Sequence, residues 1–171
     1  MLKKKMLKGM NDQINAEMFS SYLYLSMENY FQSISLGGFA AWMRAQAQEE
    51  MMHAMKFYDF IHERGGKVSL EAIAKPETNW ESPLAAFEAV LAHEQHVTSL
   101  INDLVDLAIS EKDHATNIFL QWFVSEQVEE EASAGAIVDR LKLIRDNPSG
   151  LFMMDAELGK RVFTMPQPAA E

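Results

Sequence analysis

The chain has 171 residues, of which 48% are hydrophobic, and a formal net charge of −10. This length suits one domain that buries about two thirds of its unfolded surface. The negative charge argues against a nucleic-acid partner and favours small cations.

The chain contains no cysteine. Disulfides, zinc–thiolate sites and iron–sulfur clusters are therefore excluded. The sequence shows neither a signal peptide nor an apolar run of membrane-spanning length. We therefore expect a cytoplasmic protein with no membrane partner.

Two double glycines delimit the first half of the chain. The pair at 37–38 is expected to end a first helix near residues 4–34. The pair at 65–66 is expected to end a second helix near residues 38–64. The connection between these two helices is short, so we expect them to be antiparallel neighbours.

Capping residues delimit the second half. Ser82 and Pro83 provide an N-cap and a first-position proline for a third helix that runs to about Ile109. Asp113 can cap a fourth helix that runs to about Arg145. The short turn at 110–113 again predicts antiparallel neighbours.

The chain after the fourth helix is short. Asn147-Pro148 is expected to stop that helix, and a short fifth helix is expected near residues 151–159. We assign residues 1–162 to one domain and residues 163–171, which include Pro166 and Pro168, to a flexible tail.

The long connection sets the topology. Residues 65–81 can span roughly 55 Å when extended, whereas a helix of this length measures about 40 Å. The connection can therefore cross the whole bundle and start the third helix parallel to the second. The sequence predicts an all-α, four-helix bundle with one long crossover.

Each long helix carries an apolar residue every three or four positions, which places one stripe on the core-facing side. Polar metal-ligand residues interrupt the middle of every stripe. They are Glu17, Glu50, His53, Glu94, Gln127 and Glu130. All lie near the midpoint of their helix, so they should meet at one level whichever way each helix runs.

Four buried carboxylates require compensation, and no lysine or arginine lies centrally in a stripe. This pattern points to metal ions. Two divalent ions would neutralise four glutamates, and oxygen ligands with one imidazole favour iron or manganese, with zinc and cobalt able to compete. Glu50 and His53 form a Glu-x-x-His pair whose spacing aims both side chains at one point.

A second tier of acids lies beside the stripes: Glu49, Glu126 and Glu129. Together with Glu130 they could hold a third ion, or they could form a solvated acidic face, and the sequence leaves both interpretations open. Tyr24 could donate a hydrogen bond or an electron at the site, or be an ordinary core residue. We expect Trp122 to serve packing. The other histidines, expected at the surface, are His62, His93, His96 and His114.

These residues together resemble the prokaryotic non-haem ferritins over residues 1 to about 162. The resemblance rests on Glu17, Tyr24, Glu50-x-x-His53, Glu94 and the segment at 121–131, QWFVSEQVEEE. It implies a cage of two dozen subunits that oxidises Fe(II) with dioxygen or hydrogen peroxide and stores ferric mineral.

The resemblance also implies roles for the site residues. Glu17, Glu50 and His53 would hold the first iron. Glu50 would bridge to a second iron bound by Glu94 and Glu130, with Gln127 beside them. The second-tier acids Glu49, Glu126 and Glu129 would hold, with Glu130, an accessory third iron.

Departures separate related families. Bacterioferritins carry a second Glu-x-x-His where this chain reads Gln127-x-x-Glu130, so haem is not expected, although Met51 stands where they place a haem-ligating methionine. Rubrerythrin-like proteins need cysteine, and animal heavy chains have a small residue in place of Glu130. The rivals to iron storage are a haem-containing bacterioferritin, a di-metal oxidase or peroxidase with a substrate pocket, and a helical interaction protein without metal.

Overall fold

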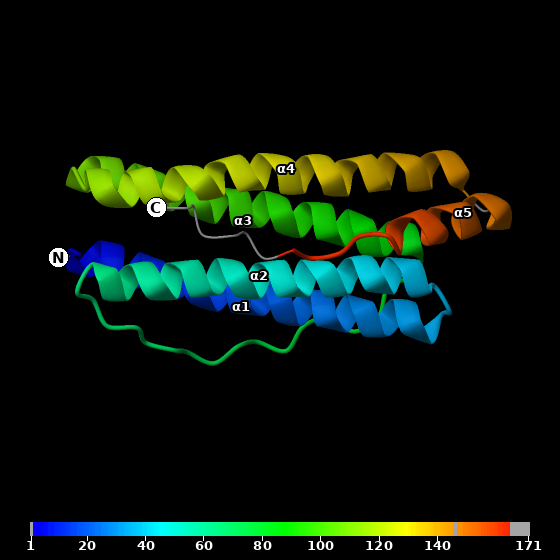
Figure 1. The fold of residues 1–171 in the computed structure, drawn as a ribbon, viewed down its shortest axis with the longest axis horizontal. Helices are drawn as coiled ribbons and strands as arrows, with labels where there is room; N and C mark the ends of the chain where they lie inside the picture. Colours follow the sequence, from blue (N-terminus) through cyan, green and yellow to red (C-terminus); the bar gives the residue numbers. More distant parts are fainter. Residues whose placement is uncertain (1, 146, 165–171) are drawn as a thin grey trace.

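The computed structural model describes residues 2–145 and 147–164, and this part of the chain contains five helices. They are α1 (Lys4–Ser33), α2 (Gly37–Glu63), α3 (Pro83–Glu111), α4 (His114–Ile144) and the short α5 (Pro148–Leu158). The first four form a bundle, and α5 lies at one end of it (Figure 1). This confirms the predicted fold class. Within the described ranges, every helix falls short of the combination of length and apolarity that a membrane span requires.

The crossover runs along the whole bundle, so that α3 starts at the same end of the bundle as α2 (Figure 1). Polar side chains of α1 fix this segment. The Asn11 side chain accepts a hydrogen bond from the Ser69 amide at 2.6 Å, and Asn15 donates to the Ala72 carbonyl at 3.2 Å. The backbone groups of an extended loop need such partners. The predicted parallel arrangement of α2 and α3 is confirmed.

Two element boundaries differ from the sequence prediction. The glycines at 37–38 do not end α1 but begin α2; the turn between the two helices is made by residues 34–36, with Ser35 at φ 62°. Asn147 and Pro148 do not merely stop α4. The Asn147 side chain accepts hydrogen bonds from Ser149 and Gly150, so α5 begins at Pro148. This is the same cap-plus-proline signal that opens α3. The expected tail at 163–171 lies outside the described residues from 165 onward.

Gly38 is required because α5 lies directly against the start of α2. A Cβ atom on Gly38 would lie 1.7 Å from the backbone oxygen of Asp155. The Asp155 carboxylate accepts hydrogen bonds from the amides of Gly38 at 2.7 Å and Phe39 at 3.0 Å. The side chain of α2's own N-cap, Leu36, provides no hydrogen bond to this helix. Asp155 therefore supplies the missing N-terminal acceptor from another helix.

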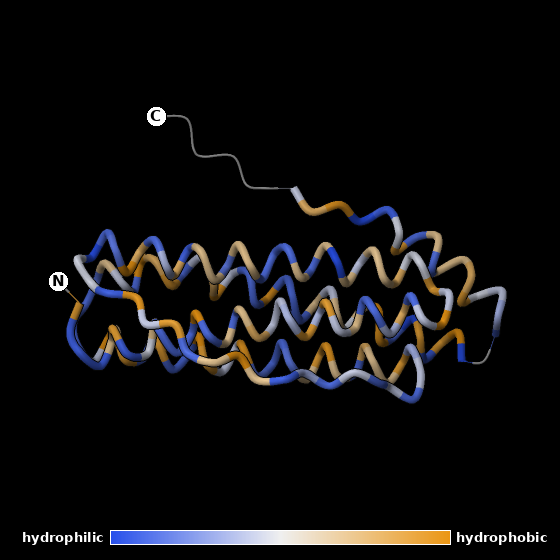
Figure 2. The backbone as a smooth tube through the Cα atoms, turned by 90° about the horizontal axis from the view of Figure 1, so that it is seen from below, coloured by the Kyte–Doolittle hydropathy of each residue, from blue (hydrophilic) through white to orange (hydrophobic). Residues whose placement is uncertain are grey.

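The core consists of two apolar clusters, one toward each end of the bundle. One contains Phe31, Phe39 and Phe87, and the other contains Phe57 and Phe123. Along each long helix, hydrophobic and hydrophilic segments alternate (Figure 2), as expected of a helix with one face on the core. The predicted polar stripe residues fall between the two clusters on all four helices. They form a buried layer, which we call the polar layer: Glu17, Glu50, His53, Glu94, Gln127 and Glu130.

Gly38→Ala should lower the free energy of unfolding by about 1–3 kcal/mol, because the added methyl group forces α5 away from α2. Gly37→Ala is the matched control, since its Cβ would meet nothing within 4 Å; it should be neutral or gain up to about 1 kcal/mol from helix propensity. Thermal and denaturant unfolding measure both. Equal stabilities of the two variants would contradict the close contact between α5 and α2.

Candidate metal centre

The polar layer receives side chains from all four long helices. Glu17 comes from α1, Glu50 and His53 from α2, Glu94 from α3, and Gln127 and Glu130 from α4. Each of these residues is at most 5% exposed. The expectation that mid-helix positions meet at one buried level is therefore met for all six.

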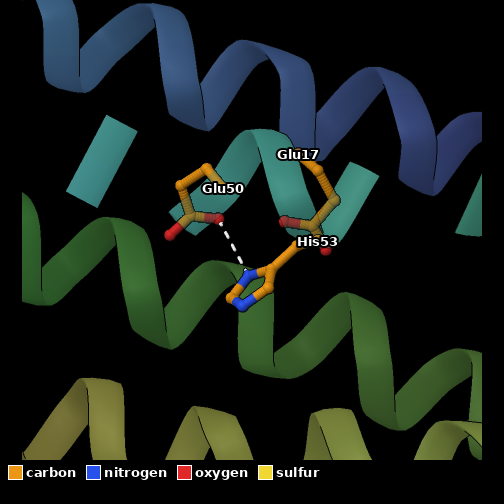
Figure 3. Close-up of side chains that lie close together, drawn as sticks. All are labelled: Glu17, Glu50 and His53. Atoms are coloured by element: carbon orange, nitrogen blue, oxygen red, sulfur yellow. Dashed lines mark ion pairs between the residues drawn. The ribbon is translucent and has the colours of Figure 1, made fainter. Parts of the chain in front are cut away.

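Glu17, Glu50 and His53 lie close together (Figure 3). Each offers one ligand atom, and these atoms lie within 4.8 Å of one another. His53 Nδ1 lies 3.3 Å from Glu50 Oε2. Glu17 Oε2 and His53 Nε2 are buried and have no hydrogen-bond partner among the described residues. Buried polar atoms without a partner are costly, and a cation held by this group would satisfy the Glu17 oxygen.

Two glutamines support this group, and the sequence prediction did not include either as a site residue. Gln13 donates to Glu17 Oε1 at 2.9 Å. Gln46 donates to Glu130 Oε2 at 2.6 Å and is 3.5 Å from Glu50 Oε1. Each glutamine precedes a site glutamate by four residues in its own helix, a spacing that brings the two side chains together. That spacing was the available signal.

Glu94 occupies a second part of the layer. The Tyr24 hydroxyl donates a hydrogen bond to Glu94 Oε1. Gln127 donates to Glu94 Oε2 at 3.3 Å and lies within 3.3 Å of Thr98 Oγ1. The structure thus brings Tyr24 to the layer as a hydrogen-bond donor to a carboxylate, one of the three interpretations left open for it.

Aromatic rings enclose His53 on one side. The ring centroids of Trp122 and Phe123 lie 5.4 Å and 5.8 Å from that of His53, both near perpendicular. Lys56 Nζ lies 4.1 Å above the Trp122 ring. Trp122 therefore packs, as expected, and the residue it packs against and orients is His53 of the polar layer.

A third group lies beside the layer. Ligand atoms of Glu49, Glu126 and Glu130 lie within 4.8 Å of one another, and we call these three residues the outer cluster. Glu49 and Glu126 are half-buried, and Glu129 is exposed and is not part of this cluster. Three of the four acids predicted for a third ion are thus brought together. Glu130 belongs both to the polar layer and to the outer cluster.

The family model of the ferritin-like domain matches residues 7–144. A bacterial non-heme ferritin of Bacteroides fragilis is 49% identical over 161 residues, which cover 94% of this chain and all of the relative. One from Campylobacter jejuni is 44% identical over 91% of this chain and 93% of its own.

Solved structures agree. An engineered closed form of the Archaeoglobus fulgidus ferritin superimposes with a TM-score of 0.95 at 56% identity, covering 96% of this chain and all of that one. An open pore ferritin from the same archaeon gives a TM-score of 0.94 at 56% identity over 95% of this chain and all of its own. The chain belongs to the ferritin family. The resemblance noted in the sequence is confirmed.

One histidine of this ferritin differs from its expected surface position. His62, His96 and His114 are exposed, whereas His93 is half-buried between α1 and α3. Its Nε2 lies 2.8 Å from Ser20 Oγ, and its ring meets Tyr24 edge-on at 6.2 Å. Burial, assisted by His96, lowers the pKa of His93 to about 4. It is a neutral packing residue behind Tyr24 at neutral pH.

Burial raises the pKa values of the layer carboxylates. The pKa of Glu17 rises well above its usual value through burial and the charge of Glu50; that of Glu50 rises through burial and the charges of Glu94 and Glu130. The pKa of Glu130 rises to about 7 through burial, then Glu94 and Glu49. The metal-free layer therefore holds protons that a cation would displace.

The raised carboxyl pKa values predict that the metal-free protein loses stability as pH rises. A carboxyl group with a folded pKa near 7 binds a proton more tightly in the folded chain than in the unfolded one. Its contribution to stability is complete below the unfolded pKa and is lost as the pH rises through 7. Between the two pKa values, each pH unit removes about 1.4 kcal/mol from the free energy of unfolding. The free energy of unfolding should therefore fall from pH 5 to 8 less steeply in Glu130→Gln than in the wild type.

Chemical denaturation of the metal-free chain at several pH values measures this difference. His93 opposes the trend between pH 4 and 6.5, but it is common to both proteins and cancels in the comparison. Asp139→Asn, which changes an exposed acid of the same helix, is the control and should follow the wild type. Parallel profiles for wild type and Glu130→Gln would contradict the raised pKa.

Proposed function

We propose that this ferritin oxidises Fe(II) at two adjacent positions in the polar layer and stores the product as ferric mineral. Iron storage follows from membership of the family; the assignment of the individual ligands is our proposal. The first ion would bind Glu17, Glu50 and His53. The second would bind Glu50, Glu94 and Glu130, with Gln127 beside it. The observation that carries the proposal is the convergence of buried Glu17, Glu50 and His53, whose ligand atoms lie within 4.8 Å of one another.

Charge balance supports two ions. The four layer glutamates carry a charge of −4 when deprotonated, which two Fe(II) ions neutralise. Without ions, burial keeps these groups partly protonated, so iron entry exchanges protons for metal. Glu50 is the natural bridge, because it shares one group with Glu17 and His53 and also feels the charges of Glu94 and Glu130.

The redox step needs an external oxidant. Two Fe(II) ions give up one electron each, and dioxygen with two protons becomes hydrogen peroxide, or hydrogen peroxide with two protons becomes two waters. The chain holds the two ions at one place and excludes bulk water. Tyr24 is held as a neutral donor at Glu94 because burial and the charge of Glu94 raise the pKa of its phenol well above the usual value. The product Fe(III) then leaves for the mineral.

We further propose a cage of two dozen subunits in the cytoplasm, without haem. Large apolar side chains on the outside support assembly: Ile118, Leu143, Phe152 and Val162 are 74–84% exposed. Such exposure is typical of surfaces that other chains cover. Size-exclusion chromatography should give about 470 kDa, two dozen times the 19.4 kDa of one chain.

The outer cluster is proposed as the site of a third, weaker ion. Glu49 and Glu126 are half-buried, so they keep part of their hydration and hold a cation less strongly than the layer does. Glu129 stays a predicted ligand, and it is exposed and lies outside the cluster. A di-metal oxidase of small molecules is the rival function, and mineral formation separates it from storage.

Glu50→Ala should abolish rapid Fe(II) oxidation, because it removes the one ligand shared by both ions. We expect the initial rate to fall by much more than about tenfold. The loss of a residue that merely orients a metal ligand already lowers activity by about tenfold or more. Stopped-flow absorbance under air measures the rate. Glu28→Ala, which removes a buried glutamate that Arg44 pairs outside the layer, should retain it. An unchanged rate in Glu50→Ala would exclude the two-ion assignment.

Zinc should stabilise the metal-free protein, since an ion that binds only the folded chain raises stability by mass action. The gain should be about 2.7 kcal/mol at a hundredfold excess over Kd. Thermal unfolding with and without Zn²⁺ measures it. The gain should shrink in His53→Ala and persist in His62→Ala, whose ring is exposed on the same helix. A melting temperature that does not change when zinc is added would count against a preformed buried site.

A further inference from the structure

Arg161 brings a cation to the site from outside the four long helices. It follows α5 in the chain, and its Nη2 atom donates to Glu49 Oε2 at 2.6 Å. Its guanidinium carbon lies 4.5 Å from the centre of the Trp42 ring. The side chains of Arg161 and Glu49 are 26% and 21% exposed, so the pair is partly shielded from solvent. Arg161 therefore lies at the outer cluster, one of whose members it contacts directly.

The position of Arg161 is set by how α5 docks. The Asp155 cap and the contact between Gly159 and Gly38, where a Cβ would lie 3.2 Å from the Gly38 Cα, fix α5 against the start of α2. The turn after α5 is closed by the hydrogen bond from the Arg161 amide to the Leu158 carbonyl at 3.1 Å. Arg161 is thus held at two points: its backbone by the turn after α5, and its guanidinium by Trp42 and Glu49.

We propose that Arg161 is the built-in counter-cation of the outer cluster, which leaves Glu49 when a metal ion binds to Glu49, Glu126 and Glu130. The inference rests on the proposed third ion. A guanidinium and a metal ion compete for the same carboxylate oxygens, and the two positive charges repel each other. The competition weakens binding at this cluster and not at Glu17, Glu50 and His53, which Arg161 does not contact. Iron that reaches the outer cluster would therefore be released readily.

A purely structural role is the competing explanation. Arg161 also pins the segment after α5 to α2, and this contact alone would affect stability but not the order of metal affinities. Arg140 offers a matched comparison: it donates to Glu157 of α5 at 2.8 Å and 2.5 Å, so it ties α5 to α4 by an arginine–carboxylate pair away from the outer cluster.

Calorimetric titration of the full, metal-free chain with Zn²⁺ tests the proposal. In the wild type we expect two tight events and one weaker event per subunit. Arg161→Gln should tighten the weaker event by about tenfold, the effect of losing one charge-assisted hydrogen bond from the competitor. The two tight events should not change. Arg140→Gln should leave all three unaltered while it lowers thermal stability to a similar extent.

The outcomes separate the two proposals. A weaker event that is unchanged or weakened in Arg161→Gln, with both tight events intact, overturns the role of Arg161 alone. Absence of the two tight events in the wild type overturns the proposed function, and the inference falls with it. A crystal of the wild type soaked in Zn²⁺ gives an independent readout: we expect metal at the outer cluster with the guanidinium turned away from Glu49. Metal there with the Arg161–Glu49 pair still formed would also overturn the proposal.

Discussion

The desolvation of four glutamates in one layer is the constraint on which this structure depends. Glu17, Glu50, Glu94 and Glu130 lie between two apolar clusters and are all at most 5% exposed. Isolated buried carboxylates are costly, so the layer must take up protons, accept hydrogen bonds or bind cations. Raised carboxyl pKa values favour the first of these, and hydrogen bonds provide the second. Gln13, Gln46, Gln127 and Tyr24 all donate to these carboxylates. Glu17 Oε2 still has no hydrogen-bond partner, and it marks a place where a bound cation would compensate.

Much of this arrangement was predictable because it depends on position within single helices. The stripe spacing identifies the inward face, and equal depth along four helices identifies the layer without knowledge of their directions. The crossover followed from a comparison of two lengths. Even the supporting glutamines carried a local signal, since Gln13 and Gln46 each precede a site glutamate by four residues.

What sequence reasoning missed depends on contacts between segments far apart in the chain. Asp155 caps α2 from α5, and the need for Gly38 is visible only once α5 is in place. Arg161 belongs to no stripe, and its link to Glu49 spans 112 positions. His93 lies off the apolar stripe of its helix, which predicts a surface position, yet Ser20 and Tyr24 cover it. Hydrophobic periodicity describes each helix by itself and carries no information on such docking.

The proposed cation positions differ in depth, and we expect the more deeply buried position to hold an ion more firmly. Glu17, Glu50 and His53 are almost fully buried, so their charges are least screened and their partners least replaceable by water. The outer cluster combines half-buried Glu49 and Glu126 with buried Glu130, and a guanidinium already lies on it. Because Glu130 belongs to the polar layer and to the outer cluster, the proposed second and third ion positions share a ligand. The proposed storage function needs the oxidised ion to leave the buried layer, and a more weakly binding position beside that layer would favour its departure.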